Sequence, residues 1–311
     1  MRRDAAVALG QTSVTAALWG TSFPVISVAL REGLNPSVFV FLRFAIAAPL
    51  MLVFALSTKR GVMTLMKSRA LWIVAFFDAV GFLCQYVGQQ YTPASVAALL
   101  INLSVVLAAV GAAVFLGEKL GAYKVIGVVL AFAGTVLIAT NGDLGAVVGG
   151  ELLGDALYLL AAFSWAAYIV YAKRKTDEMD WDPYAAATCI VSLTAVFVLP
   201  AALIAGGPIP TSAAAWEAIA YTAVFNTAIP FALYQAALKH MTAASSAIVL
   251  MLEIVVAVLI SVVFLGETFT LFSLVGALGV LASILLVSGV ELRGKSLSVG
   301  ETDASPVRVS S

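Results

Sequence analysis

Long apolar stretches alternate with short polar breaks along almost the whole chain. A helix of about 20 apolar residues spans the hydrocarbon core of a bilayer. By that measure the pattern predicts ten membrane helices, with approximate limits at residues 7–30, 36–57, 70–91, 94–116, 123–141, 151–172, 182–205, 213–238, 243–265 and 270–290. Residues 291–311 are polar and rich in Ser, Gly and charge, so we expect them to form a disordered tail.

Basic residues fall almost entirely on one side of the membrane in this arrangement. Fifteen Lys and Arg residues lie at breaks and ends that share one side, whereas only Arg31 lies on the other side and Arg43 within a span. Because Lys and Arg accumulate on the cytoplasmic side of membrane proteins, the pattern predicts that both termini are cytoplasmic. The first apolar stretch is too long for the core of a signal peptide, so we expect it to be retained as a helix.

An internal repeat fixes the architecture. The pentapeptide Val-Phe-Leu-Gly-Glu occurs at 114–118 and again at 263–267, 149 residues later, and its two glycines are expected to end helices. Aligning the copies also pairs Gly127 with Gly276. The repeat unit therefore holds five helices, with residues 7–141 as the first unit and 151–290 as the second. Because five is odd, the second unit is inverted, and we predict an all-α membrane protein of two inverted five-helix repeats.

Inverted repeats are characteristic of secondary transporters, which hold their substrate near the bilayer midplane between the two halves. The composition agrees with a membrane location, since 62% of the residues are hydrophobic and 11% charged, against about 25% charged in soluble domains. A net charge of zero gives no sign of nucleic-acid binding. Neither a Walker A motif nor metal-ligand spacing is present. The single His240 lies at a helix end, so we expect no enzyme activity and no cofactor.

Several short motifs, in this order, resemble the EamA branch of the drug/metabolite transporter superfamily: Trp19-Gly20-x-x-Phe23, Arg43-Phe44, "TPAS" ending at Ser95, and the repeated Leu-Gly-Glu. The resemblance to the branch covers residues 7–290, and a weaker, finer resemblance within it is to the YddG-type exporters of aromatic and neutral amino acids. It implies export of metabolites, commonly amino acids, across the bacterial inner membrane. The chain departs from many members at Val105 and Ile254, where those members have proline midway along the fourth and ninth helices.

Polar groups at mid-membrane depth are the first candidates for substrate binding, because a charge there costs about 2.5–3.5 kcal/mol on insertion scales. Asp78 and Glu253 could accept a proton or bind a substrate ammonium, and Arg43 could bind a carboxylate. An internal pair between Arg43 and Glu253 that only joins helices is the competing interpretation.

Large rings and uncharged polar groups complete the set of candidate substrate-binding residues, which adds Trp19, Trp165, Tyr168, Gln85, Tyr86, Asn102, Asn226, Tyr234 and Gln235. Each of them could instead pack or hydrogen-bond between helices. The fourth, fifth, ninth and tenth helices have few polar residues and are expected to form a scaffold, with the other six helices lining the cavity.

The sequence thus predicts a secondary transporter that exports aromatic or neutral amino acids, or similar small metabolites, by alternating access without ATP. Its partners would be the small-molecule substrate, the lipid bilayer and, if transport is coupled, protons. An alternative keeps the fold but makes the protein a proton-coupled exporter of cationic or lipophilic drugs.

Overall fold

The computed structural model describes residues 2–58, 61–92, 94–143, 145, 151–207, 210–265 and 269–300, and every extended regular element in this part is a helix. The first half contains α1 (Arg2–Gly20), α2 (Ser22–Arg31), α3 (Pro36–Ser57), α4 (Val62–Leu65), α5 (Arg69–Gly88), α6 (Ala94–Leu116) and α7 (Ala122–Thr140). The second half contains α8 (Leu152–Met179), α9 (Pro183–Ala205), α10 (Ala213–Ala223), the π-helix η2 (Val224–Ala228), α11 (Ile229–Leu238), α12 (Ala243–Leu250), α13 (Leu252–Leu265) and α14 (Leu271–Gly300).

All ten predicted segments are largely helical, and eight of the helical stretches in the described part are long and apolar enough to cross a membrane. The other two segments are interrupted, and within the ninth only Met251 separates α12 from α13. Residues 7–30 divide between α1 and α2, and residues 213–238 divide between α10, η2 and α11. Helix α14 continues to Gly300, ten residues past the predicted limit. Residues 301–311 lie outside the described part, so the disorder of the tail stays a prediction.

Side-chain caps define where several helices begin. Asn35 accepts a hydrogen bond from the backbone N–H of Ser37, and Pro36 occupies the first turn of α3. Asp182 caps α9 in the same way, with Pro183 in its first turn. Such caps satisfy backbone donors that have no partner within the helix, and proline there removes a donor that would be unpaired in any case.

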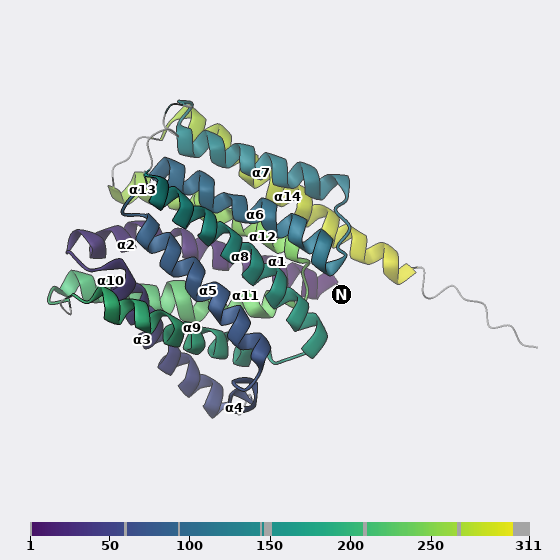
Figure 1. Ribbon diagram of the computed structural model, residues 1–311. Coiled ribbons are helices and arrows are strands. Elements are labelled where there is room, and N and C mark those ends of the chain that lie inside the picture. The colour runs from purple at the N-terminus through teal and green to yellow at the C-terminus, as the bar shows by residue number, and fades with distance from the viewer. Residues whose placement is uncertain are drawn as a thin grey trace, which may run out of the picture.

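The helices pack in a pattern that pairs the two halves. Helix α7 packs along α14, α3 along α9, α5 and α6 against α8, and α1 against α11, α12 and α13. Figure 1 shows α7 and α14 together at the top of the bundle, with α3 and α9 toward the opposite edge. The N-terminus and the far end of α14 lie at the same end of the bundle in this view.

Glycine permits the closest approach between the halves. A Cβ atom on Gly134 of α7 would lie 2.5 Å from the carbonyl oxygen of Gly276 in α14, and a Cβ atom on Gly276 would lie 2.5 Å from the carbonyl oxygen of Gly134. In membranes the hydrophobic effect contributes little to helix association, because lipid tails are as apolar as the side chains. Small residues at the interface therefore allow the helix backbones to approach closely and pack.

The repeated Leu-Gly-Glu motif has a structural role that the sequence alone does not reveal. Gly117 follows the end of α6 with a positive φ of 67°, as expected for a glycine that ends a helix. The carboxylate of Glu118 then accepts hydrogen bonds from the backbone N–H groups of Ala243 at 2.6 Å and Ala244 at 3.3 Å. It therefore caps α12, a helix of the other half. Gly266 and Glu267, in the second copy, lie outside the described residues.

We predict that Gly134→Ala lowers the thermal stability of the purified protein in detergent, by roughly 1–3 kcal/mol, because the added methyl group meets the backbone of α14. Gly10→Ala in α1 is the matched control, since a Cβ atom there meets nothing within 4 Å. Alanine also favours a helix by about 1 kcal/mol over glycine, so the control is expected to be neutral or stabilising. Equal melting temperatures for the two variants would contradict the close contact.

Candidate functional site

A cavity of about 120 Å³ lies among the helices, with walls from both halves of the chain. Helices α1, α2, α3, α5, α6, α8, α11, α12 and α13 all contribute to it. Its described lining residues are Trp19, Ser22, Arg43, Phe82, Gln85, Tyr86, Ile101, Asn102, Ser104, Val105, Trp165, Tyr168, Ile169, Tyr234, Ala247, Leu250, Met251, Glu253 and Ile254. Arg43 and Glu253 are the charged residues among them.

Nine of the twelve predicted site residues line this cavity: Trp19, Arg43, Gln85, Tyr86, Asn102, Trp165, Tyr168, Tyr234 and Glu253. The other three, Asp78, Asn226 and Gln235, are fully buried and do not belong to its described lining. The fourth and ninth segments, which were expected to act mainly as scaffold, in fact supply much of the wall through α6, α12 and α13.

Arg43 is held by oxygens that carry no formal charge. Its Nε donates to Thr227 Oγ1 at 2.6 Å, its Nη1 to the Tyr86 hydroxyl at 2.7 Å, and its Nη2 to the backbone carbonyl of Asn226 at 2.6 Å. The guanidinium carbon also lies 4.8 Å from the centre of the Phe82 ring, a geometry in which the ring face attracts the cation. The residue is 1% exposed. Within the described residues no salt bridge joins Arg43 to Glu253, although the charge of Arg43 still acts on the Glu253 carboxyl through space.

The π-helical turn η2 supplies two of these acceptors. Pro230 lies four residues after Asn226 and has no N–H, so it cannot donate the α-helical hydrogen bond that the Asn226 carbonyl would otherwise accept. That carbonyl instead accepts from Arg43 and from Trp19 Nε1, the latter at 3.0 Å. Single π-turns of this kind occur frequently at functional sites.

The side chain of Asn226 extends this network to the break between α1 and α2. Its amide Nδ2 donates to the backbone carbonyl of Leu18 and, at 3.1 Å, to Thr21 Oγ1. Gly20 lies between these two residues, and a Cβ atom there would be 2.5 Å from the carbonyl oxygen of Glu253. The break in the first segment therefore packs directly against the start of α13.

The two carboxylates at mid-membrane depth have different surroundings. Asp78 accepts a hydrogen bond from Thr194 Oγ1 at 2.8 Å, and its other oxygen is buried without a partner. It thus belongs to the contact between α5 and α9. Glu253 lies in the first turn of α13, directly after the break at Met251, and lines the cavity. Its carboxylate has no hydrogen-bond or ion-pair partner among the residues that the structure describes.

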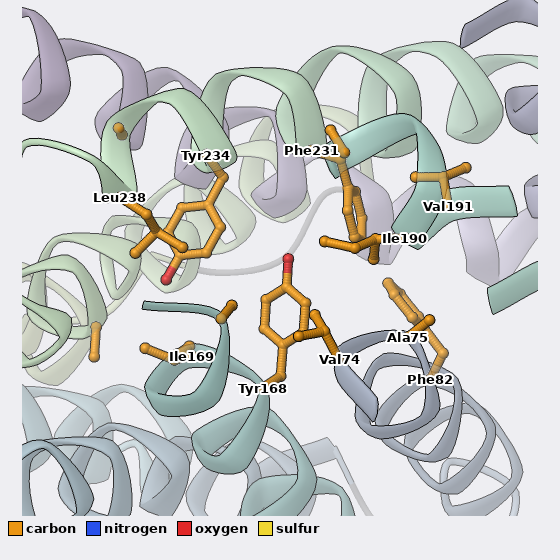
Figure 2. Packing of buried hydrophobic residues seen from close by; sticks show 14 of the residues in the cluster. Val74, Ala75, Phe82, Tyr168, Ile169, Ile190, Val191, Phe231, Tyr234 and Leu238 are labelled. Carbon is orange, nitrogen blue, oxygen red and sulfur yellow. The ribbon is translucent and has the colours of Figure 1, made fainter. Parts of the chain in front are cut away.

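Aromatic rings from several helices form a continuous wall. Phe82 of α5 lies edge-on to Trp165 of α8, with ring centroids 4.8 Å apart, and Tyr168 stacks on Tyr234 of α11 at 6.4 Å. Gln235 donates to the Tyr168 hydroxyl at 2.9 Å. Figure 2 shows Tyr168 extending from its helix toward the helix that carries Phe231 and Tyr234.

Lysine side chains join the helices at one end of the bundle, which we call the lysine end and define by Lys124, Lys173 and Lys239. Lys173 donates to the carbonyl of Leu238 at 2.9 Å, and Lys124 donates to Thr242 Oγ1 at 3.0 Å. Lys239 donates to Asp180 at 2.8 Å and thereby holds the pKa of that exposed carboxyl below its usual range. The contacts of Lys173 and Lys239 join the end of α8 to the end of α11, and the contact of Lys124 holds the residue that precedes α12.

Sequence reasoning missed two residues that contact Arg43, namely Phe82 and Thr227. Phe82 precedes Gln85 and Tyr86 by three and four residues, so helical spacing alone could have put it on the same face. Thr227 carries no such signal, because its contact with Arg43 depends on the π-turn.

Several known proteins are similar to this chain over most of its length. A model of the EamA-like transporter family matches residues 9–140 and 152–289. An uncharacterized transporter of Archaeoglobus fulgidus is 28% identical over 281 residues, which cover 89% of this chain and 95% of that protein. A probable terminal-alkyne amino-acid exporter of Streptantibioticus cattleyicolor is 27% identical over 283 residues, covering 88% of this chain and 91% of that protein. A crystal structure with 16% identity has a TM-score of 0.79 and covers 93% of this chain and 98% of its own, which shows a shared fold.

We predict that Arg43→Lys lowers the melting temperature in detergent, by an amount equivalent to about 1–3 kcal/mol, because an ammonium cannot reach all three acceptors and leaves buried oxygens unpaired. Arg174→Lys is the matched control, since Arg174 is exposed and pairs with Glu178 on the helix surface. The control should change little. If both variants melt at the wild-type temperature, the three hydrogen bonds of Arg43 do not hold the helices together.

Proposed function

The chain belongs to the EamA-like transporter family, and from this premise we propose that it is a secondary transporter that exports amino acids or similar small metabolites. The family and the similar proteins are multi-pass membrane transporters and not enzymes. Transport would proceed by alternating access around the cavity, without ATP. Aromatic and neutral amino acids are the expected substrates, in the direction from cytoplasm to exterior.

The observation that carries this proposal is the cavity itself. It lies where both halves meet, and its wall combines aromatic rings with a few polar groups, as small-molecule sites do. Its volume of about 120 Å³ is well below the roughly 300–1,000 Å³ of pockets for drug-sized ligands. This size favours a small metabolite over the drugs of the alternative interpretation.

We further propose ten membrane crossings arranged as two inverted repeats, with α1 and α2 forming one crossing and α10, η2 and α11 another. Two contacts support the symmetry. A Cβ atom on Gly127 would lie 2.7 Å from Val287, and one on Gly276 would lie 2.8 Å from Ile138. Adding 149 to 127 and to 138 gives 276 and 287, so the same contact recurs with the halves exchanged. The family model also matches two separate stretches of the chain.

The orientation follows from the charge pattern. We propose that the lysine end faces the cytoplasm of a bacterial cell and that the protein resides in the inner membrane, with both termini inside. In that orientation the Tyr168–Tyr234 stack lies between the cavity and the cytoplasm, because Tyr234 precedes the lysine end of α11 by one helical turn.

Amino acids are proposed as substrates on two grounds. One similar protein, from Streptantibioticus cattleyicolor, is named as a probable amino-acid exporter. The cavity wall also offers rings for an apolar side chain, and polar groups such as Gln85 and Asn102 for the backbone atoms of an amino acid.

Counterflow in proteoliposomes tests this proposal. Purified protein is reconstituted with unlabelled amino acid inside, and uptake of the labelled form is measured for a panel of aromatic and neutral amino acids and one lipophilic cation. We expect saturable exchange of at least one amino acid. Repeating the assay with an imposed pH gradient separates proton-coupled from facilitated transport. Absence of flux for every amino acid would refute the proposed function, and flux of the cation alone would favour the drug-exporter alternative.

We predict that Trp165→Leu weakens the apparent affinity for aromatic amino acids about 2- to 10-fold, since an aromatic contact contributes roughly 0.5–1.5 kcal/mol beyond its area. Trp216→Leu is the matched control, because Trp216 donates to Pro210 near a helix start and does not line the cavity. Equal effects of the two substitutions in the counterflow assay would argue against the cavity as the substrate site.

A further inference from the structure

We propose that the cavity recognises the protonated amine of its substrate through Glu253 and makes no direct contact between a substrate carboxylate and Arg43, so that amines without a carboxylate are also ligands. This inference rests on the proposed function, because it takes the cavity to be the transport site. It narrows the substrate class from amino acids to compounds defined by an ammonium group beside an apolar body.

Arg43 is already occupied by the protein. Its Nε, Nη1 and Nη2 each donate to a different acceptor, and the Phe82 ring lies over the guanidinium. With 1% of its surface exposed, the side chain offers almost no area to a ligand. A carboxylate would have to displace the Tyr86 hydroxyl or a group of the π-turn, and the displaced group would then be buried without a partner.

Glu253 is in the opposite situation. It lines the cavity and has no hydrogen-bond or ion-pair partner among the described residues. A carboxylate without a partner in a cavity wall attracts a cation that can donate several hydrogen bonds to it, and a protonated amine is such a group.

The rest of the wall is suited to a cation with an apolar body. Aromatic faces attract ammonium groups, and Trp19, Trp165 and Tyr234 all line the cavity. The described lining contains no Lys or His that could receive a carboxylate in place of Arg43. The amide Nδ2 of Asn102 donates to the carbonyl of Ala98, so it is also partly occupied. A substrate carboxylate would therefore meet neutral groups only.

The internal repeat explains why only the second half of the chain offers a carboxylate to the substrate ammonium. The residue equivalent to Glu253, 149 positions earlier, is Ser104, which also lines the cavity. The fold thus presents the same cavity position twice, once as a carboxylate and once as a hydroxyl. Only the second half would bind the ammonium, which fixes one orientation of the substrate in the cavity.

Three ligands with the same ring but different charged groups test the inference: L-phenylalanine, 2-phenylethylamine without the carboxylate, and 3-phenylpropionate without the amine. Binding to the purified full-length protein in detergent is measured by calorimetry and by inhibition of phenylalanine counterflow. We expect phenylethylamine to bind within about threefold of phenylalanine and phenylpropionate to bind at least about tenfold more weakly.

Variants of Glu253 test whether this residue binds the amine. Glu253→Gln should weaken binding of phenylalanine and phenylethylamine at least about tenfold, with the melting temperature measured to verify folding. Glu253→Asp keeps the charge and should keep the preference for amines over the acid. Glu217→Gln in α10 is the matched control, because Glu217 does not line the cavity, and it should leave all three affinities unchanged.

The outcomes separate this inference from the proposed function. Phenylalanine binding without phenylethylamine binding, or phenylpropionate binding as tightly as phenylalanine, would overturn the inference and leave amino-acid transport standing. Unchanged amine affinity in a folded Glu253→Gln protein would overturn it as well. If none of the three ligands binds, the proposed transport of aromatic amino acids fails together with it. Should Glu253→Gln fail to fold, the wild-type panel alone decides.

Discussion

The structure depends on one buried cation, the Arg43 guanidinium, which three uncharged oxygens hold without a salt bridge in the described part of the chain. The Arg43 guanidinium joins α3 to Tyr86 of α5 and to the π-turn between α10 and α11 through three short hydrogen bonds. A charge at this depth is costly to bury unless its donors are satisfied, so the three acceptors must keep their places. The side chain of Asn226 also hydrogen-bonds to the break between α1 and α2 and so holds that break against the π-turn. Four segments that are distant in the sequence are thereby held around one point.

The cavity follows from that arrangement. The α1–α2 break lets Gly20 approach Glu253, and the single residue Met251 separates α12 from α13 beside it. At the N-terminal end of α12, the carboxylate of Glu118, which belongs to the other half of the chain, caps the helix. Arg43 is thus satisfied by the protein, whereas Glu253 lines the cavity without a hydrogen-bond partner among the described residues.

Much of this could be predicted from the sequence, and the failures have physical reasons. Apolar length located the eight helices of the described part that are long enough to cross a membrane, and depth along each helix found Trp165 and Glu253 at the cavity. Depth does not give the rotation of a helix about its axis, so Asp78 and Gln235 were expected at the site but face other helices. The π-turn depends on Pro230 four residues after Asn226, together with a cation from another helix. The partner of Glu118 lies 125 residues away and could not be inferred from a local pattern.

We propose that Arg43 hydrogen-bonds only to the protein and that Glu253 binds the amine of the substrate. The most direct measurement is an experimental structure of the protein with an amino acid bound in the cavity. The account predicts that the substrate amine lies within hydrogen-bonding distance of the Glu253 carboxylate, while Arg43 keeps its bonds to Tyr86, Thr227 and Asn226. A substrate carboxylate bound to the guanidinium, with any of those three acceptors displaced, would contradict it.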